Sequence, residues 1–407
     1  MNCRHCGVFL KNIFLDLGQL PPSNAYLTKN DLQQSETYYP LKILVCEQCW
    51  LVQTEDYTNA EDLFTSQYAY FSSTSSSWLV HAKKYADKII QELNLNSESY
   101  VIEIASNDGY LLKNFVAAKI PCLGIEPTAS TSAVAEKIGI SVLRKFFGKD
   151  LASKLVSNGS RADLIIGNNV YAHVPDINDF TMGLKEILKK NGTITLEFPH
   201  FMNLIKHNQF DTIYHEHFSY LSLHTVRQIF EKAGLRIFNV EELNTHGGSL
   251  RVYGCHMDDV RKTRSTVDLL LKKERKSGLQ KIETYKNFQL RVDMIKNDLI
   301  KFLSEQKIKG KKVVAYGAAA KGNTLLNYCR IKADLLPIVF DAAQSKQGCF
   351  MPGSHIPILS LEHLIEIKPD YVLILPWNIS DEIIIQNASL KKNGTQFLVA
   401  IPQLKII

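Results

Sequence analysis

The 407-residue chain carries 47 lysines and arginines against 41 acidic residues, a net charge of +6, and 45% of its residues are hydrophobic. This size and composition predict a soluble protein of two or three domains, each with its own core. The basic excess is small and forms no stripe interleaved with aromatic residues, so we expect no nucleic-acid partner. A small anionic substrate suits the charge equally well.

Membrane and secretory segments are not expected. No apolar stretch approaches the roughly 20 residues that cross a bilayer, and the N-terminus lacks the basic and apolar regions of a signal peptide. We therefore expect a cytoplasmic protein without membrane contact, and no stretch indicates a protein partner. Four scattered cysteines are predicted to be unpaired thiols, as in a reducing compartment: Cys122, Cys255, Cys329 and Cys349.

The N-terminal region contains two Cys-x-x-Cys pairs, Cys3-Arg-His-Cys6 and Cys46-Glu-Gln-Cys49. Two such turns together supply four thiolates, the donor set of a tetrahedral zinc site with no open position for substrate. We therefore predict a structural Zn²⁺, although the 39 intervening residues exceed the usual short spacing. The run 41–45 is predicted to be the strand that delivers the second pair. The alternative is two free or redox-active cysteine pairs.

Residues 64–77 are rich in aromatic and hydroxyl side chains. One interpretation is a linker that packs its rings and caps the helix predicted at 78–93. The other is a lid that presents Tyr68 and Tyr70 to a ligand, and both remain open at this stage.

The central region, about 78–256, alternates strand-like runs with helical patterns. This alternation predicts a mainly parallel sheet with helices on both faces. Two later runs have no helix between them and are predicted to close the sheet as an antiparallel pair. The strand-like runs are 100–104, 122–126, 140–145, 162–167, 192–198, 235–243 and 249–256.

The turn after the first of these strands, Glu103-Ile-Ala-Ser106-Asn107-Asp-Gly109, keeps one glycine of the three in a dinucleotide fingerprint. It leaves room for a nucleoside but lacks a pyrophosphate cradle. Glu126 closes the next strand, where a carboxylate can bind two ribose hydroxyls. Together these features resemble class I S-adenosylmethionine-dependent methyltransferases.

The stretch from Asp211 to Tyr220 concentrates groups that accept or donate protons, among them Tyr214, Glu216 and His217. It follows the fifth strand-like run, and open parallel sheets bind ligands beyond the carboxyl ends of their strands. We therefore predict a catalytic site here. The alternatives are a polar loop without chemistry, or a metal site through His215 and His217.

The last 150 residues consist of a charged helical stretch, 258–309, and a second α/β pattern. In the latter, the stretch from Tyr316 to Thr324 combines a strand end, small residues and a helix start. Backbone N–H groups at such a turn bind anions, and Lys321 adds a positive charge. Phosphate binding is favoured over close helix–strand packing as the explanation.

Read in order, these blocks resemble the nucleotide-sugar C-methyltransferases of deoxysugar biosynthesis over nearly the whole chain. The resemblance implies an α/β protein with four parts: a zinc-binding domain at 1–65, a class I methyltransferase domain at 66–256, a helical linker at 257–309 and a Rossmann-like domain at 310–407. The matching blocks include Tyr68-Ala-Tyr70, Gly167-Asn168-Asn-Val-Tyr-Ala-His173, Tyr214-His-Glu-His217 and Gly247-Gly-Ser-Leu-Arg-Val.

The resemblance further implies methyl transfer from S-adenosylmethionine to a ring carbon next to the ketone of a nucleoside-diphosphate sugar, as in enzymes acting on dTDP-4-keto-deoxysugars. We interpret His217 as the base that forms an enolate, held by Glu216 or Tyr214. His173 would stabilise the enolate or clamp the sugar, and the assignment of the base between the two histidines stays open. The sequence does not specify the sugar, the nucleotide or methylation at C-3 as against C-5.

The predicted site residues fall into three groups. The catalytic group is Tyr68, His173, Tyr214, Glu216 and His217. The cofactor group is Glu103, Ser106, Asn107, Gly109, Glu126 and Asn168. The substrate group is Tyr70, Tyr316, Gly317, Lys321 and Asn323.

Two other functions are weighed against this one. An NAD-dependent oxidoreductase of nucleotide sugars would need a glycine-rich dinucleotide loop, which neither candidate turn supplies. A non-catalytic zinc module that binds nucleic acid leaves the tyrosine–histidine stretch unexplained.

Overall fold

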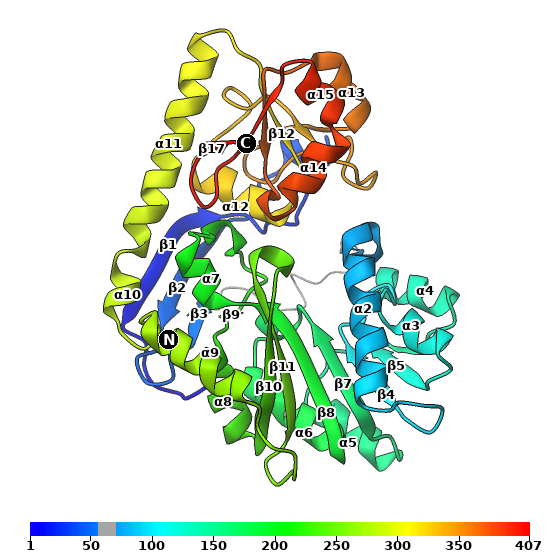
Figure 1. Cartoon of the computed structure of the whole chain (residues 1–407). Coiled ribbons are helices and arrows are strands. Elements are labelled where there is room, and N and C mark those ends of the chain that lie inside the picture. The colour runs from blue at the N-terminus through cyan, green and yellow to red at the C-terminus, as the bar shows by residue number, and fades with distance from the viewer. Residues whose placement is uncertain (56–70) are drawn as a thin grey trace.

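The computed structural model of the chain describes residues 1–55 and 71–407, which form three sheets and the helices that cover them (Figure 1). The predicted site residues Tyr68 and Tyr70 lie outside the described residues. No helix in the described ranges combines the length and apolar content needed to cross a membrane.

The N-terminal sheet is antiparallel, in the order β1-β2-β3-β9. Its second strand contains the predicted strand 41–45. Its fourth strand comes from the predicted catalytic stretch, because Tyr220 pairs with Val52 and Ser219 pairs with Gln53. The strands are β1 (Asn12–Leu20), β2 (Tyr39–Val45), β3 (Val52–Thr54) and β9 (Ser219–Tyr220).

The middle sheet has seven strands in the order β10-β11-β8-β7-β4-β5-β6. The five neighbouring strands β8, β7, β4, β5 and β6 run parallel. Strands β11 and β10 close the sheet as the predicted antiparallel pair. Leu164, Ile165 and Ile166 are all fully buried, as expected of a strand covered on both faces. The strands are β4 (Val101–Ile104), β5 (Cys122–Ile125), β6 (Val142–Leu143), β7 (Ala162–Asn168), β8 (Leu188–Pro199), β10 (Leu235–Leu243) and β11 (Ser249–His256).

Helices connect these strands in the alternation that the sequence predicts. The chain enters the sheet through a helix that Ser75 caps, since the Ser75 side chain accepts a hydrogen bond from the N–H of Trp78. The helices are α2 (Ser76–Glu92), α3 (Leu112–Ala117), α4 (Ala129–Lys137), α5 (Lys149–Ser157), α6 (Ile177–Ile187), α7 (Phe201–Lys206) and α8 (Leu223–Lys232).

The predicted helical linker consists of α9 (Ser265–Lys276), α10 (Glu283–Lys286) and α11 (Phe288–Ile308). The long helix α11 runs along one side of the molecule from the N-terminal sheet to the C-terminal sheet (Figure 1). Its buried residues recur every three or four positions, which is the spacing of one helix face.

The C-terminal sheet has the order β14-β13-β12-β15-β16-β17 and is parallel except for β17. Its helices are α12 (Ala320–Tyr328), α13 (Leu361–Ile367), α14 (Ser380–Gln386) and α15 (Ala388–Lys392). Its strands are β12 (Val313–Tyr316), β13 (Val339–Phe340), β14 (Ile358–Leu359), β15 (Tyr371–Ile374), β16 (Gln396–Val399) and β17 (Lys405–Ile406).

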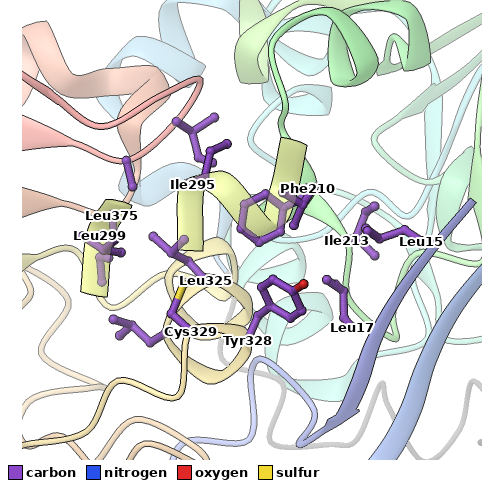
Figure 2. Packing of buried hydrophobic residues seen from close by; sticks show 14 of the residues in the cluster. Leu15, Leu17, Phe210, Ile213, Ile295, Leu299, Leu325, Tyr328, Cys329 and Leu375 are labelled. Atoms are coloured by element: carbon purple, nitrogen blue, oxygen red, sulfur yellow. The ribbon is translucent and has the colours of Figure 1, made fainter. Parts of the chain in front are cut away.

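One hydrophobic core joins the N-terminal sheet, the C-terminal sheet and the linker helices. Figure 2 shows Leu15 and Leu17 of β1 beside Ile213 of the predicted catalytic stretch and Tyr328 of α12. Phe210, which precedes that stretch, packs its ring on Tyr328 at 5.6 Å. Because apolar burial contributes about 25 cal/mol per Å², this shared core fixes the parts of the protein around the predicted site.

Candidate active site

The four paired cysteines form one cluster. Cys3 and Cys49 place their sulfurs 3.5 Å apart, as do Cys6 and Cys46, and all four Sγ atoms lie within 4.8 Å of one another. Zn–S bonds of about 2.3 Å at the corners of a tetrahedron put sulfurs roughly 3.8 Å apart. The donor set and its spacing therefore fit Zn²⁺.

Both cysteine turns have the same backbone geometry. The residue after each second cysteine, Gly7 or Trp50, has a positive φ of 80° or 59°. Its N–H donates to the carbonyl of the first cysteine at 2.9 Å. His5 lies in the first turn and contacts Asn178 through Nδ1 at 2.8 Å, so it fastens the cysteine cluster to helix α6 and is not a ligand.

The first residues of the stretch 211–220 form hydrogen bonds with the C-terminal part of the protein. The buried carboxylate of Asp211 accepts from Trp377 Nε1 at 2.6 Å, and the carbonyl of Ile213 accepts from Thr324 Oγ1 at 2.9 Å. Burial raises the pKa of Asp211 to about 6, against the nearby charge of Lys321.

The rest of the stretch is bonded to the N-terminal and middle sheets. The carboxylate of Glu216 accepts from Asn24 Nδ2 at 2.6 Å, and His215 Nε2 donates to the carbonyl of Tyr39 at 3.2 Å. Phe218 N–H donates to Ala172 O at 2.8 Å. His215 is therefore engaged with the backbone of β2, and among the described residues the cysteine cluster is the sole group of three or more potential metal ligands.

His217 is buried and held in one tautomer. Its Nδ1 donates to the carbonyl of Thr212 at 2.8 Å, so a neutral ring keeps its lone pair on Nε2. The ring of Tyr214 packs 4.1 Å away and that of His173 lies 4.5 Å away, edge-on. Burial holds the pKa of His217 well below its ordinary value, with a further contribution from His173. His217 is therefore a neutral acceptor at pH 7, and of its two expected supports, Tyr214 contacts it while Glu216 binds Asn24.

His173 ends the short helix η3 (Tyr171–His173) beyond the carboxyl end of β7. Burial lowers its pKa to about 4. Both rings of this histidine pair are consequently uncharged at neutral pH, and neither repels the other.

Lys321 projects from the start of α12 toward the same region. Its Nζ donates to Asn378 Oδ1 at 2.6 Å and lies 4.6 Å from the ring centre of Trp377. Burial lowers its pKa to about 8, opposed by the charge of Asp211. The ammonium is close enough to lower the pKa values of His217 and of a third histidine, His246.

Some backbone N–H groups of the turn before α12 already donate hydrogen bonds within the protein. Asp341 accepts from Ala318 N–H at 2.6 Å, and Ala319 N–H donates to Gly317 O at 2.8 Å. The N–H groups of residues 320–322 are the first of the helix and lack intrahelical acceptors. A β-carbon on Gly317, whose φ is +89°, would lie 2.4 Å from the Pro376 ring.

Two other residues of the predicted substrate group are already engaged within the protein. Asn323 is buried and its Nδ2 donates to Ser23 O at 2.6 Å. Tyr316 is buried in the core of the C-terminal sheet. Both therefore support the turn, and Lys321 is the member of this group that reaches the histidines.

The predicted cofactor turn lies at the carboxyl ends of β4 and β5. Ala105, Asn107 and Gly109 all have positive φ, between 50° and 78°. Glu126 orders this turn, because its two carboxylate oxygens accept from the N–H groups of Asn107, at 3.0 Å, and Thr128, at 2.9 Å. A side chain at Gly109 would strike Ile140, whose Cδ1 would be 2.4 Å from the added β-carbon.

Buried polar atoms near this turn fit a bound polar cofactor. Ser106 Oγ, Asp108 Oδ1 and both amide atoms of Asn168 are buried without a hydrogen-bond partner in ranges 1–55 and 71–407. Buried polar groups normally have partners, so a ligand is the natural complement. Glu103 is also buried, and burial raises its pKa well above the ordinary value.

The same turn anchors the segment that follows residue 70. Asn107 Oδ1 accepts from Ser72 N–H at 2.9 Å, and Asp108 Oδ2 accepts from Ser73 N–H at 3.0 Å. Ser72 and Ser73 are therefore fixed against the cofactor turn.

Several residues of this region were not predicted from the sequence. Asp211 opens the singled-out stretch, and Trp377 follows the carboxyl end of β15, so strand-end position is a signal for Trp377 alone. His246 precedes the Gly247-Gly248 pair after β10, a turn signal next to a titratable side chain. Asn169 is adjacent to Asn168, a predicted residue.

Comparison with known proteins identifies the family of this chain. Family models match residues 3–64 ("Putative zinc binding domain"), 78–240 ("Methyltransferase domain") and 244–402 ("C-methyltransferase C-terminal domain"). The C-methyltransferase NovU of Streptomyces niveus is 33% identical over 408 residues, which span 100% of this chain and 96% of NovU. The chain belongs to the C-methyltransferase family. Its middle sheet is a class I S-adenosylmethionine-dependent methyltransferase fold, as predicted, its methyl donor is S-adenosylmethionine, and its four cysteines bind structural zinc.

Solved structures resemble part of this C-methyltransferase. Magnesium protoporphyrin IX methyltransferase of Synechocystis covers 44% of the chain and is matched over 82% of its own length, with 12% identity and a TM-score of 0.35. An S-adenosylmethionine-dependent methyltransferase of Thermotoga maritima covers 48% and is matched over 99%, with 16% identity and a TM-score of 0.36.

Proposed function

We propose that this enzyme methylates a ring carbon next to the ketone of a nucleoside-diphosphate 4-keto-deoxysugar, with dTDP sugars as the first class to test. The observation that supports this most is the oriented, neutral imidazole of His217, whose pKa the nearby ammonium of Lys321 helps to lower. The first suits removal of a proton from carbon, and the second suits an anionic substrate.

His217 is the proposed general base. A carbon next to a ketone is weakly acidic, and a neutral imidazole with its lone pair on Nε2 can accept its proton. The Thr212 carbonyl fixes Nδ1–H and therefore the direction of Nε2. Bound S-adenosylmethionine supplies an electrophilic methyl group for the enolate carbon. Tyr214 and His173 hold the base from two sides, and Tyr68 and Tyr70 are proposed to border the sugar.

Lys321 is the proposed contact for the diphosphate. Among the described residues no carboxylate lies within ion-pair distance of its Nζ, although Asp211 is near enough to influence its pKa. The free N–H groups of residues 320–322 open α12 beside it, and helix N-termini favour anions. Gly317 and Tyr316 shape this turn, and Asn323 ties it to the N-terminal part.

The cofactor residues are proposed to bind S-adenosylmethionine along the β4–β5 edge. Glu126 is proposed to accept from the ribose hydroxyls, Gly109 keeps a positive-φ turn that has no space for a side chain, and Ser106 and Asn168 offer buried polar atoms. We also propose that the domain boundaries lie at about residues 65, 256 and 309. The protein is further proposed to act in the cytoplasm.

A surface cavity of about 370 Å³ near Lys307, Lys311 and Pro337 is not the proposed site. It lies at the amino ends of β12 and β13, whereas ligands of open parallel sheets bind beyond the carboxyl ends.

The test is an assay of the purified zinc-loaded enzyme with S-adenosylmethionine and a dTDP-4-keto-6-deoxysugar, analysed by mass spectrometry and carbon NMR. We expect a product with one added methyl on a carbon next to the ketone. A methyl on oxygen or nitrogen, or no turnover with any nucleoside-diphosphate keto-sugar, would contradict the proposal.

A further inference from the structure

The turn that joins β10 to β11 carries His246 in a left-handed backbone conformation, with φ 52° and ψ 28°. The turn belongs to the short helix η5 (Thr245–Gly247) and lies beyond the carboxyl end of β10. β10 runs parallel to β8, because β11 pairs antiparallel with both, so this turn lies at the same edge of the sheet as the proposed site. A non-glycine residue keeps this conformation only where its surroundings hold it, and such residues cluster at functional sites.

The surroundings that hold His246 come from the two sides of the site. Asn169 Nδ2 donates to His246 Nε2 at 3.1 Å, and Asn169 itself has a φ of 54°. The edge of the imidazole meets the ring of Trp78 at 5.0 Å, at the start of α2. Thr245 is fixed in turn by the buried carboxylate of Glu197, at 2.9 Å.

The imidazole is therefore oriented as a donor. With Nε2 accepting from Asn169, the proton of the neutral ring sits on Nδ1. No described residue makes a hydrogen bond to Nδ1. The side chain is only half-buried, so this N–H is open to a ligand.

The ring also lies near the proposed base and Lys321. Lys321 and His246 both lower the pKa of His217, and Lys321 lowers that of His246. The next residue, Gly247, approaches Trp377 so closely that an added β-carbon would lie 2.4 Å from its ring. His246 therefore precedes a residue packed on Trp377, and the ring of Trp377 also contacts Lys321 at 4.6 Å.

We propose that His246 is a further catalytic residue, whose Nδ1–H donates a hydrogen bond to the substrate oxygen that becomes negative when the proton leaves carbon. The inference rests on the proposed function. His217 Nε2 takes the hydrogen as a proton, the C–H electron pair becomes the C=C bond, and the carbonyl π pair moves onto oxygen. When the new C–CH₃ bond forms, the C=C pair makes that bond, the S–CH₃ pair stays on the sulfur of the departing S-adenosylhomocysteine, and the oxygen pair restores the ketone. A neutral imidazole suits this role because it donates without surrendering its proton.

The first test is His246→Gly. Glycine adopts the same backbone without strain, so the turn is retained and only the ring is lost. Losing one donor to a developing oxyanion typically costs 10²–10³ in kcat, and we expect that loss with KM changed by a few-fold at most. The matched control is His355→Gly, which has a φ of 55° and contacts Glu36 away from the site; it should keep wild-type kcat. Wild-type kcat in His246→Gly would overturn the inference.

The second test separates a donor to the enolate from a residue that only positions the cofactor. In deuterated water with S-adenosylhomocysteine bound, the wild type should exchange the acidic hydrogen of the keto-sugar. His246→Gly should lose exchange and methylation by the same factor. Methylation lost with exchange intact would overturn the inference while leaving the proposed function in place.

A further variant guards against a folding defect. Asn169→Gly keeps the left-handed backbone but removes the amide that orients the ring, so we expect exchange and methylation to fall together, by less than in His246→Gly. Unchanged rates in a folded Asn169→Gly would also overturn the inference. If the wild type neither exchanges nor methylates any nucleoside-diphosphate keto-sugar, the proposed function fails, and the inference fails with it.

Discussion

The charge of Lys321 should set the alkaline limit of the reaction. Its pKa lies near 8 because burial disfavours the ammonium, and the groups that face it are Asp211, His217 and His246. Both histidines have lowered pKa values and stay neutral above pH 7, so they do not contribute to this limit. A cation with a lowered pKa is present below that pKa and lost above it. We therefore expect kcat/KM to be nearly constant around pH 7, between the pKa values of Asp211 and Lys321, and about tenfold lower at pH 9.

Two substitutions test the assignment. Lys321→Arg keeps a positive charge at every accessible pH, so the alkaline limb should disappear even if the absolute rate falls. Lys321→Met removes one charge-assisted contact worth about 1.5–3 kcal/mol, which corresponds to roughly a 10- to 150-fold loss of kcat/KM, with no limb near pH 8.

The assay is kcat/KM for the nucleoside-diphosphate keto-sugar from pH 6 to 10, with saturating S-adenosylmethionine. Lys311→Arg is the control, because Lys311 pairs with Asp370 on the exposed surface at the other end of β12. An alkaline limb near pH 8 that persists unchanged in Lys321→Arg would refute the reasoning.

Two more predictions concern zinc and the cofactor. Cys46→Ser should lower zinc content and the melting temperature together. Activity should fall as well, because β3 adjoins the cysteine cluster and pairs with β9 next to His217. Loss of zinc with an unchanged melting temperature and full activity would show that the metal does not stabilise the fold. Glu126→Ala should weaken S-adenosylmethionine binding roughly tenfold to a hundredfold by calorimetry, since a charge-assisted pair contributes about 1.5–3 kcal/mol, and an unchanged dissociation constant would place the cofactor elsewhere.

Local sequence patterns predicted most of the fold. The zinc cluster could be predicted because each Cys-x-x-Cys turn presents its two thiolates without help from the rest of the chain. The middle sheet could be predicted because buried parallel strands are continuous apolar runs between helices. Strands β14 and β17 were not predicted, since two residues are too short to show any periodicity.

The contacts that the predicted site residues make could not be predicted from the sequence. The stretch 211–220 stood out by composition, yet nothing local indicates that Glu216 binds Asn24 or that Asp211 binds Trp377. Nothing local indicates either that Nδ2 of Asn323, predicted to contact a substrate, donates to Ser23. Each of these contacts joins segments far apart in the sequence, and a single chain gives no signal for such pairs.

Hydrogen exchange at the sugar carbon tests the central claim, that His217 removes the proton before methyl transfer. In deuterated water with S-adenosylhomocysteine bound, the wild type should wash out the acidic hydrogen. His217→Gln should lose exchange and methylation by about 10²–10⁴-fold while binding both ligands normally. If His217→Gln exchanges and methylates at the wild-type rate while His173→Gln does neither, the base is His173 and not His217.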